Sequence, residues 1–91
     1  MPEFLRTIGY KIYFWSNEGD EPVHFHLTKG NPNKNDTKIW ILSNMSFEIA
    51  HNKGQVPQKD LAKVFSVMQS YIFDFLDYWK NYFSTPIKFY K

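Results

Sequence analysis

The stretch EPVHFHL, residues 21–27, decides the expected fold because apolar and polar side chains alternate along it. Successive side chains of a β-strand point to opposite faces, so its valine, phenylalanine and leucine share one face, and His24 and His26 share the other. This two-residue period is typical of a strand with one face in a core. We therefore expect a sheet whose apolar face is covered by another layer and whose histidine face points away from that layer.

Three neighbouring segments show the same alternation and complete the expected sheet. They lie within residues 4–17, 37–42 and 45–50, and Gly9 indicates a bulge or a tight bend inside the first of them. The connecting segments are rich in Gly, Pro, Asn and Asp, which favour turns. Because short connections favour antiparallel neighbours, the sequence predicts a meander of about four strands over residues 4–50.

Residues 57–83 have the spacing of one long helix. Pro57 suits the first helical turn, where a missing N–H costs nothing. Apolar residues then recur at steps of three, one and four, which places them along one side of a helix. They are Leu61, Val64, Phe65, Met68, Ile72, Phe75, Leu76, Trp79 and Phe83. We predict an α+β fold in which this helix packs on one face of the sheet and a C-terminal tail, residues 84–91, follows it.

Composition favours a single globular domain over residues 1–91. The apolar fraction is 43% and the charged fraction 22%, which is ordinary for a folded chain, and so short a chain rarely holds two cores. There are no cysteines, which excludes disulfides, thiolate zinc sites and a cysteine nucleophile. No stretch approaches the roughly 20 apolar residues of a spanning helix, and the start lacks the apolar run of a signal peptide. We expect a cytoplasmic protein with no membrane partner.

Aromatic residues make up 20% of the chain, more than one small core easily hides. Tyr71, Tyr78 and Tyr82, together with Val67, form a second row beside the apolar side of the predicted helix. One interpretation is a helix half-embedded in the core. The other is a surface where this tyrosine row binds a partner protein or a second copy of the chain.

His24 and His26 lie on one strand face with Cβ atoms ~7 Å apart, close enough to share a metal ion. The pair alone assigns no metal and no other cofactor, because a metal site needs a third or fourth ligand. The candidates for further ligands are His51, Glu18, Asp20, Glu21 and Glu48.

Two other interpretations of the histidine pair remain open. In the first, His24 and His26 act as acid and base in metal-independent ribonuclease chemistry, with Lys11 or Lys38 stabilising negative charge. Tyr13 lies on the same face of its strand as Lys11, and a surface that combines aromatic rings with positive charge suits the binding of single-stranded RNA. In the second, the two imidazoles face water on the outer face of a one-sided sheet. The net charge of +2 is too small to indicate nucleic-acid binding by itself.

The opening MPEFLRTIGYKIYFWSNEGDEPVHFHLTKG resembles the start of small bacterial proteins grouped as domain-of-unknown-function family 4160. Their pattern begins M-P, continues through an apolar strand and an acidic turn, and reaches P-P-H-F-H or P-P-H-V-H. A K-x-W-I strand, a KDL helix start at residues 59–61 and the aromatic DYWKNYF helix extend the resemblance to Phe83. The chain departs from the pattern at Val23, where the second proline would stand.

By this resemblance, Pro22, His24 and His26 correspond to positions of the family's pattern. Tyr13 and Trp15 correspond to family positions as well. It implies one half of a two-gene module similar to toxin–antitoxin pairs, in which an adjacent gene encodes a small partner protein. We therefore expect an interaction module. A small ribonuclease-like enzyme and a metal-binding domain, both centred on the histidine pair, are the alternatives.

Overall fold

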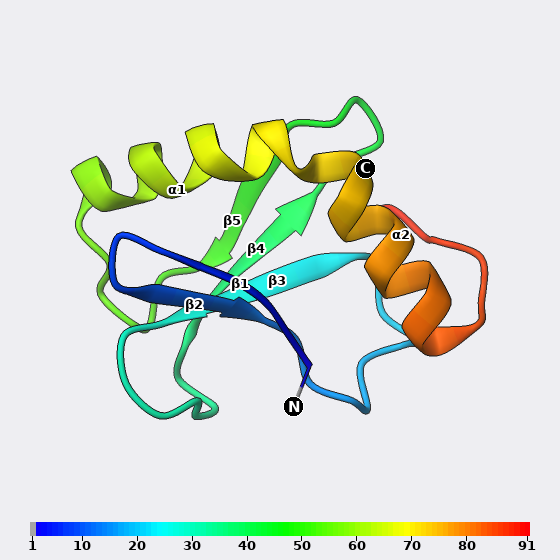
Figure 1. Ribbon diagram of the computed structural model, residues 1–91, viewed down its shortest axis with the longest axis horizontal. Helices are drawn as coiled ribbons and strands as arrows, with labels where there is room; N and C mark the ends of the chain where they lie inside the picture. The colour runs from blue at the N-terminus through cyan, green and yellow to red at the C-terminus, as the bar shows by residue number, and fades with distance from the viewer. Residues whose placement is uncertain (1) are drawn as a thin grey trace.

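A computed structural model describes residues 2–91 as an antiparallel sheet with two helices packed against it (Figure 1). The sheet order is β1-β2-β3-β4-β5, and each strand is antiparallel to its neighbours. The strands are β1 (Glu3–Thr7), β2 (Tyr10–Tyr13), β3 (His24–Thr28), β4 (Thr37–Ile41) and β5 (Phe47–His51). The helices are α1 (Gln58–Ser70) and α2 (Ile72–Phe83). The predicted α+β class and the antiparallel meander are confirmed.

The predicted number of four strands is wrong, because the first aromatic segment folds back on itself. Ile8 and Gly9 both have positive φ, 44° and 86°, and form the two-residue turn between β1 and β2. Two consecutive residues of positive φ match the twist of a tight hairpin, and glycine adopts this conformation without strain. Gly9 therefore lies in a tight turn that divides this segment into two strands, and it does not form a bulge.

The prediction of a single long helix is also wrong, because the helix breaks at Tyr71. This residue has φ −111° and ψ 12°, and its N–H donates to the Met68 carbonyl at 3.1 Å, three residues back rather than four. Figure 1 shows α2 turning sharply away from α1 and running past the end of the sheet where β3 begins. The break lets one apolar stripe cover first a face of the sheet and then its end.

The core lies between one face of the sheet and the two helices. Phe14 is fully buried in it, and its ring contacts Phe75 and Trp79 of α2, with ring centroids 6.0 and 4.8 Å away. The alternating apolar positions of β2, β3 and β4 all face this core, as the two-residue period predicts. The remaining buried core residues are Tyr10, Ile12, Val23, Phe25, Leu27, Ile39, Ile41, Val56, Leu61, Val64, Met68, Ile72 and Leu76.

The C-terminal tail packs back on the protein and covers part of the other face of the sheet. The N–H of Val23 donates to the Lys88 carbonyl at 2.8 Å, which ties the tail to the chain just before β3. Farther along, the Tyr90 ring stacks on Trp40 with the two planes only 8° apart. Because the tail and the loops cover this second face, the sheet is not one-sided.

Candidate functional site

The second face of the sheet carries a buried cluster of Glu18, His24 and His26, which we call the histidine–glutamate cluster. The histidines stand on β3, and Glu18 lies on the loop that leads into it. That loop makes a turn in which the Glu18 N–H donates to the Trp15 carbonyl at 3.2 Å. The Trp15 N–H in turn donates to Oε1 of Glu18 at 2.6 Å, so local bonds aim the carboxylate at the histidines.

His24 is completely buried, and its two ring nitrogens have different surroundings. Nδ1 lies 2.9 Å from the Pro22 carbonyl oxygen, and because a carbonyl only accepts, Nδ1 carries the proton. Nε2 lies 3.0 Å from Oε2 of Glu18, but the oxygen is off the line on which a ring N–H points, so no hydrogen bond forms. Nε2 is therefore a buried polar atom without a hydrogen-bond partner among residues 2–91.

His26 makes the hydrogen bond that His24 lacks. Its Nε2 donates to the Glu18 carboxylate, at 3.0 Å from Oε2 and 3.2 Å from Oε1. Its ring packs beside Tyr13, with centroids 5.3 Å apart, and its Nδ1 is buried with no hydrogen-bond partner in the described chain. One carboxylate oxygen thus lies between the Nε2 atoms of both histidines.

The carboxyl group of Glu18 is held in its ionised form. Burial by itself raises the pKa of this group, but the contacts with His24 and His26 and the bond from the Trp15 N–H outweigh burial and hold the pKa well below its usual range. The cluster therefore contains a buried negative charge. Such a charge requires a compensating positive charge or several hydrogen bonds nearby.

The expectation that both histidines face water is wrong. The exposed fraction of His24 is 0% and that of His26 is 7%. The expectation that they point away from the helix is wrong for His24, whose ring lies 5.2 Å from that of Trp79 in α2. The cause is the break at Tyr71, which carries α2 around the end of the sheet. Strand alternation predicts the face of a side chain but not what covers that face.

The other candidate metal ligands lie outside the cluster. Glu21 pairs with Lys38, with Oε1 and Nζ 2.6 Å apart, and Glu48 pairs with Lys91 at 2.9 Å. His51 stands opposite Lys38 on β5, and burial together with nearby positive charge lowers its pKa. Within residues 2–91, the only ligand atoms of His, Asp and Glu that lie within 4.8 Å of one another in a group of three are those of Glu18, His24 and His26.

The residues proposed to assist nuclease chemistry are only partly brought together. Tyr13 lies beside His26 but is fully buried, and its hydroxyl donates to Asp36. Burial and the Asp36 carboxylate raise the pKa of Tyr13. Lys38 is paired with Glu21 at 2.6 Å, and Lys11 stands opposite Thr28 two positions along β2 from Tyr13.

Sequence reasoning missed Asp36. It is buried, and its carboxylate also accepts the Asn33 N–H at 3.0 Å. Its place at the end of a Gly, Pro and Asn turn suggested only a turn residue.

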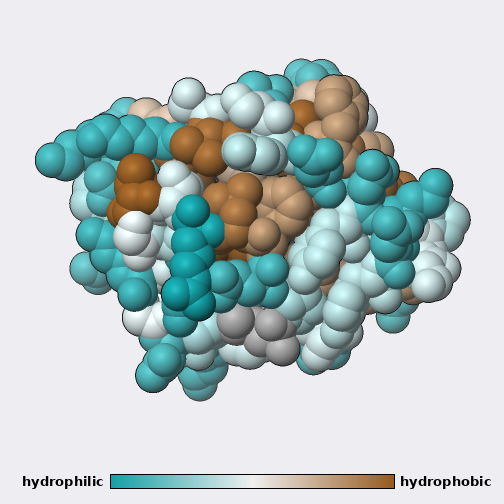
Figure 2. All heavy atoms as spheres, viewed as in Figure 1, coloured by the Kyte–Doolittle hydropathy of each residue, from teal (hydrophilic) through white to brown (hydrophobic). Residues whose placement is uncertain are grey.

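Val67, Tyr71 and Tyr78 of the tyrosine row lie beside β1, whereas the Tyr82 ring packs against Phe14 and Phe83. Tyr71 and Tyr82 are each 47% exposed, whereas Tyr78 is half-buried and its ring packs against Phe4 and Phe14. A groove of about 480 Å³, which we call the β1–helix groove, lies between part of β1 and the helices. It is lined by Phe4, Leu5, Arg6, Thr7, Val67, Tyr71 and Asp74. Figure 2 shows apolar surface gathered in the middle of this side of the molecule.

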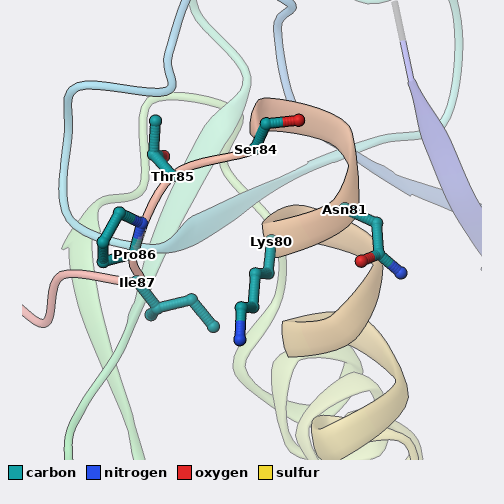
Figure 3. A pocket seen from close by; sticks show the side chains of 6 residues that line it. All are labelled: Lys80, Asn81, Ser84, Thr85, Pro86 and Ile87. Carbon is teal, nitrogen blue, oxygen red and sulfur yellow. The ribbon is translucent and has the colours of Figure 1, made fainter.

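A second hollow, of about 600 Å³, lies between the last turn of α2 and the segment that follows it (Figure 3). Its lining residues are Lys80, Asn81, Ser84, Thr85, Pro86 and Ile87. Lys80 is the one ionisable side chain among them, so the hollow offers neither an acid–base pair nor a set of metal ligands. It contains no residue of the histidine–glutamate cluster and none of the tyrosine row.

Fold and cluster together define a small α+β domain in which an antiparallel meander carries a buried histidine pair on its third strand. The chain belongs to the family described as Domain of unknown function (DUF4160), whose family model matches residues 9–80. The resemblance based on the P-x-H-x-H element is thereby confirmed. No curated protein and no solved structure matches the chain. Over residues 2–91, neither helix has the length and apolar character needed to cross a membrane.

Proposed function

We propose that this protein is the protein-binding member of a two-protein module of the toxin–antitoxin kind, and that it holds its partner in the β1–helix groove. The partner is a small protein encoded by an adjacent gene. The observation that carries the proposal is the exposed Tyr71 ring on an apolar groove beside an edge strand. Aromatic residues at the edge of an apolar groove are common anchors of protein interfaces.

The edge strand determines the form of the partner segment. β1 pairs only with β2, so one side of β1 has no neighbouring strand among the strands described. An unpaired edge accepts an extended segment of another chain through backbone hydrogen bonds. The groove lies beside β1 and would receive alternate side chains of that added strand.

The lining of the groove determines the chemistry of those side chains. Phe4, Leu5 and Val67 make its floor apolar. Of the two charged lining residues, Arg6 is already paired with Glu3 at 2.7 Å, whereas Asp74 makes no ion pair within residues 2–91. We expect a partner segment that places an apolar side chain in the groove and a basic residue near Asp74.

Co-purification with the product of the adjacent gene tests the proposal. Tyr71→Lys should weaken the complex about tenfold or more, because it removes an aromatic anchor and buries a charge. Phe73→Lys is the matched control, since Phe73 is 68% exposed and does not line the groove. Failure to co-purify with the wild-type chain would overturn the module. Loss of binding in the Phe73 variant alone would overturn the proposal that the partner binds in the groove.

The ribonuclease hypothesis has less support from the geometry. A phosphodiester must reach both members of an acid–base pair, and the fully buried His24 ring has no access to solvent. Degradation of single-stranded RNA by the purified chain, abolished by His26→Ala, would revive the hypothesis.

A further inference from the structure

We propose that Glu18, His24 and His26 bind one divalent transition-metal ion of the zinc class, through a carboxylate oxygen and the Nε2 atom of each imidazole. The three ligand atoms lie within 4.8 Å of one another, and all three residues are buried. Two imidazoles with one carboxylate form a donor set common to zinc and non-haem iron sites. The site is separate from the β1–helix groove and does not depend on the proposed docking function.

The unpartnered Nε2 of His24 is the first observation that indicates a cation. Because Nδ1 donates to the Pro22 carbonyl, a neutral His24 has a lone pair on Nε2. Nε2 lies 3.0 Å from Oε2 of Glu18 and makes no hydrogen bond. This nitrogen and the carboxylate oxygen are two ligand atoms close enough for one cation to bind both. The lone pair is not aimed at Oε2, so an ion can lie at a point that is within reach of both Nε2 and the carboxylate.

The backbone bond of His24 is the second observation. Histidines that bind metals usually donate the other ring N–H to a carboxylate or a backbone carbonyl, which selects the tautomer and orients the ring. Here the Pro22 carbonyl performs that role at 2.9 Å. Trp40 and Trp79 hold the same ring from its sides, at centroid distances of 5.6 and 5.2 Å. His24 is therefore positioned as a ligand before any ion binds.

The charge around the cluster also favours a cation. Glu18 is a buried carboxyl group, and a second buried acidic residue, Asp36, accepts the hydroxyl hydrogen bond of Tyr13, whose ring packs on His26. The nearest lysine along the cross-strand row is Lys38, and Glu21 pairs with it at 2.6 Å. A divalent ion would offset the carboxylate charge in this buried setting.

The ligand atoms must rearrange to admit the ion. Zinc binds nitrogen and oxygen at about 2.0–2.2 Å, which separates tetrahedral ligands by roughly 3.4 Å. The observed 3.0 Å contacts require Glu18 to withdraw by a few tenths of an ångström. His26 must also move its proton from Nε2 to Nδ1, which weakens binding because Nδ1 has no acceptor among the described residues. Three protein ligands leave a fourth position for water.

A zinc titration of the chelator-treated full chain tests the site. We expect one Zn²⁺ per chain and no binding of Mg²⁺, which prefers six oxygen ligands. Co²⁺ in the same site should give the visible absorption of a four-coordinate ion. A free Zn²⁺ concentration of about 100 μM lies far above the dissociation constants typical of protein zinc sites. Absence of Zn²⁺ binding at this concentration would overturn the proposal.

Matched variants locate the ion. Glu18→Gln should weaken Zn²⁺ binding by about 100-fold or more, since loss of an outer-shell group alone costs about 10- to 100-fold. Glu21→Gln and His51→Asn change a nearby carboxylate and a nearby imidazole outside the cluster, and should leave the affinity unchanged. Binding that survives Glu18→Gln but is lost in His51→Asn would overturn the assignment.

A measurement on the wild-type chain covers the case in which Glu18→Gln fails to fold. Zn²⁺ should shift the ¹⁵N resonances of Nε2 in both His24 and His26, and His26 should change tautomer. His51 serves as the internal control and should not respond. Shifts confined to His51, or no shifts at all, would overturn the proposal.

Discussion

Nε2 of His24 lies 3.0 Å from Oε2 of Glu18, yet no hydrogen bond joins these two buried groups. His26 does form such a bond with the same oxygen. The two imidazoles are therefore not equivalent, although they are two positions apart in the sequence and lie on the same strand face. This asymmetry distinguishes the cluster from an ordinary buried ion pair, because polar groups in protein interiors are nearly always hydrogen-bonded.

Zinc should raise the thermal stability of the protein if the cluster binds it in the folded state only. At a free metal concentration 100 times the dissociation constant, the gain is about 2.7 kcal/mol, which corresponds to a rise in Tm of about 10 °C or more for a domain of this size. Differential scanning fluorimetry measures the shift, and excess chelator should reverse it. An equal rise in the Glu18→Gln variant would show that the metal binds elsewhere.

Tyr10 should make stability fall at alkaline pH. Burial and the hydrogen bond to Asp60 raise the pKa of Tyr10 to about 12 from an unfolded value near 10. The neutral phenol thus stabilises the fold fully below pH 10, and this contribution is lost as the pH rises from 10 to 12.

Urea unfolding of the wild type and of Tyr10→Phe between pH 8 and pH 11.5 checks this dependence. The wild type should be more stable at pH 8, where its hydroxyl donates to Asp60 at 2.8 Å. The difference should close above pH 10, because the ionised phenolate repels the carboxylate. Two curves that stay parallel over the whole range would contradict the assignment to Tyr10.

Gly19→Ala should destabilise the protein by about 1–3 kcal/mol through overpacking. A Cβ atom at Gly19 would lie 2.5 Å from Cδ1 of Phe83, a ring already packed against Trp79 and Phe14. Gly30→Ala is the control, because nothing lies within 4 Å of its added Cβ. Chemical denaturation measures both variants. A Gly19 variant as stable as the Gly30 variant would show that the Phe83 ring moves freely.

Tyr90→Ala should release the C-terminal tail and cost about 0.5–1.5 kcal/mol beyond the lost burial, because its ring stacks on Trp40 at a centroid distance of 4.8 Å. Tyr71→Ala is the matched control, since Tyr71 has nearly the same exposed fraction, 47% against 49%, and no stacked ring within residues 2–91. Tryptophan fluorescence should respond to the first change only. Equal effects of both substitutions would contradict a specific role for the stack.

The local pattern predicted those features that depend on neighbours along the chain. Alternation around Phe25 and Ile39 predicted core-facing strands, and the apolar stripe through Val64 and Phe75 predicted a helix packed on the sheet. These periods are intrinsic to extended and helical backbones, so they can be recognised without knowing the fold. Gly9 likewise signalled a bend, although its role as the second turn residue of a hairpin required the pairing of β1 with β2.

The sequence alone determined that His24 and His26 share a strand face opposite Phe25. Only the tertiary structure decided that this face is buried, that Glu18 meets the pair, and that the helix breaks at Tyr71. The physical reason is range: alternation is a property of one strand, whereas burial depends on segments distant in sequence, such as Trp79 and the tail. No proline or glycine stands at Tyr71 to predict the helix break from the sequence. The break depends instead on the packing of α2 around the end of the sheet.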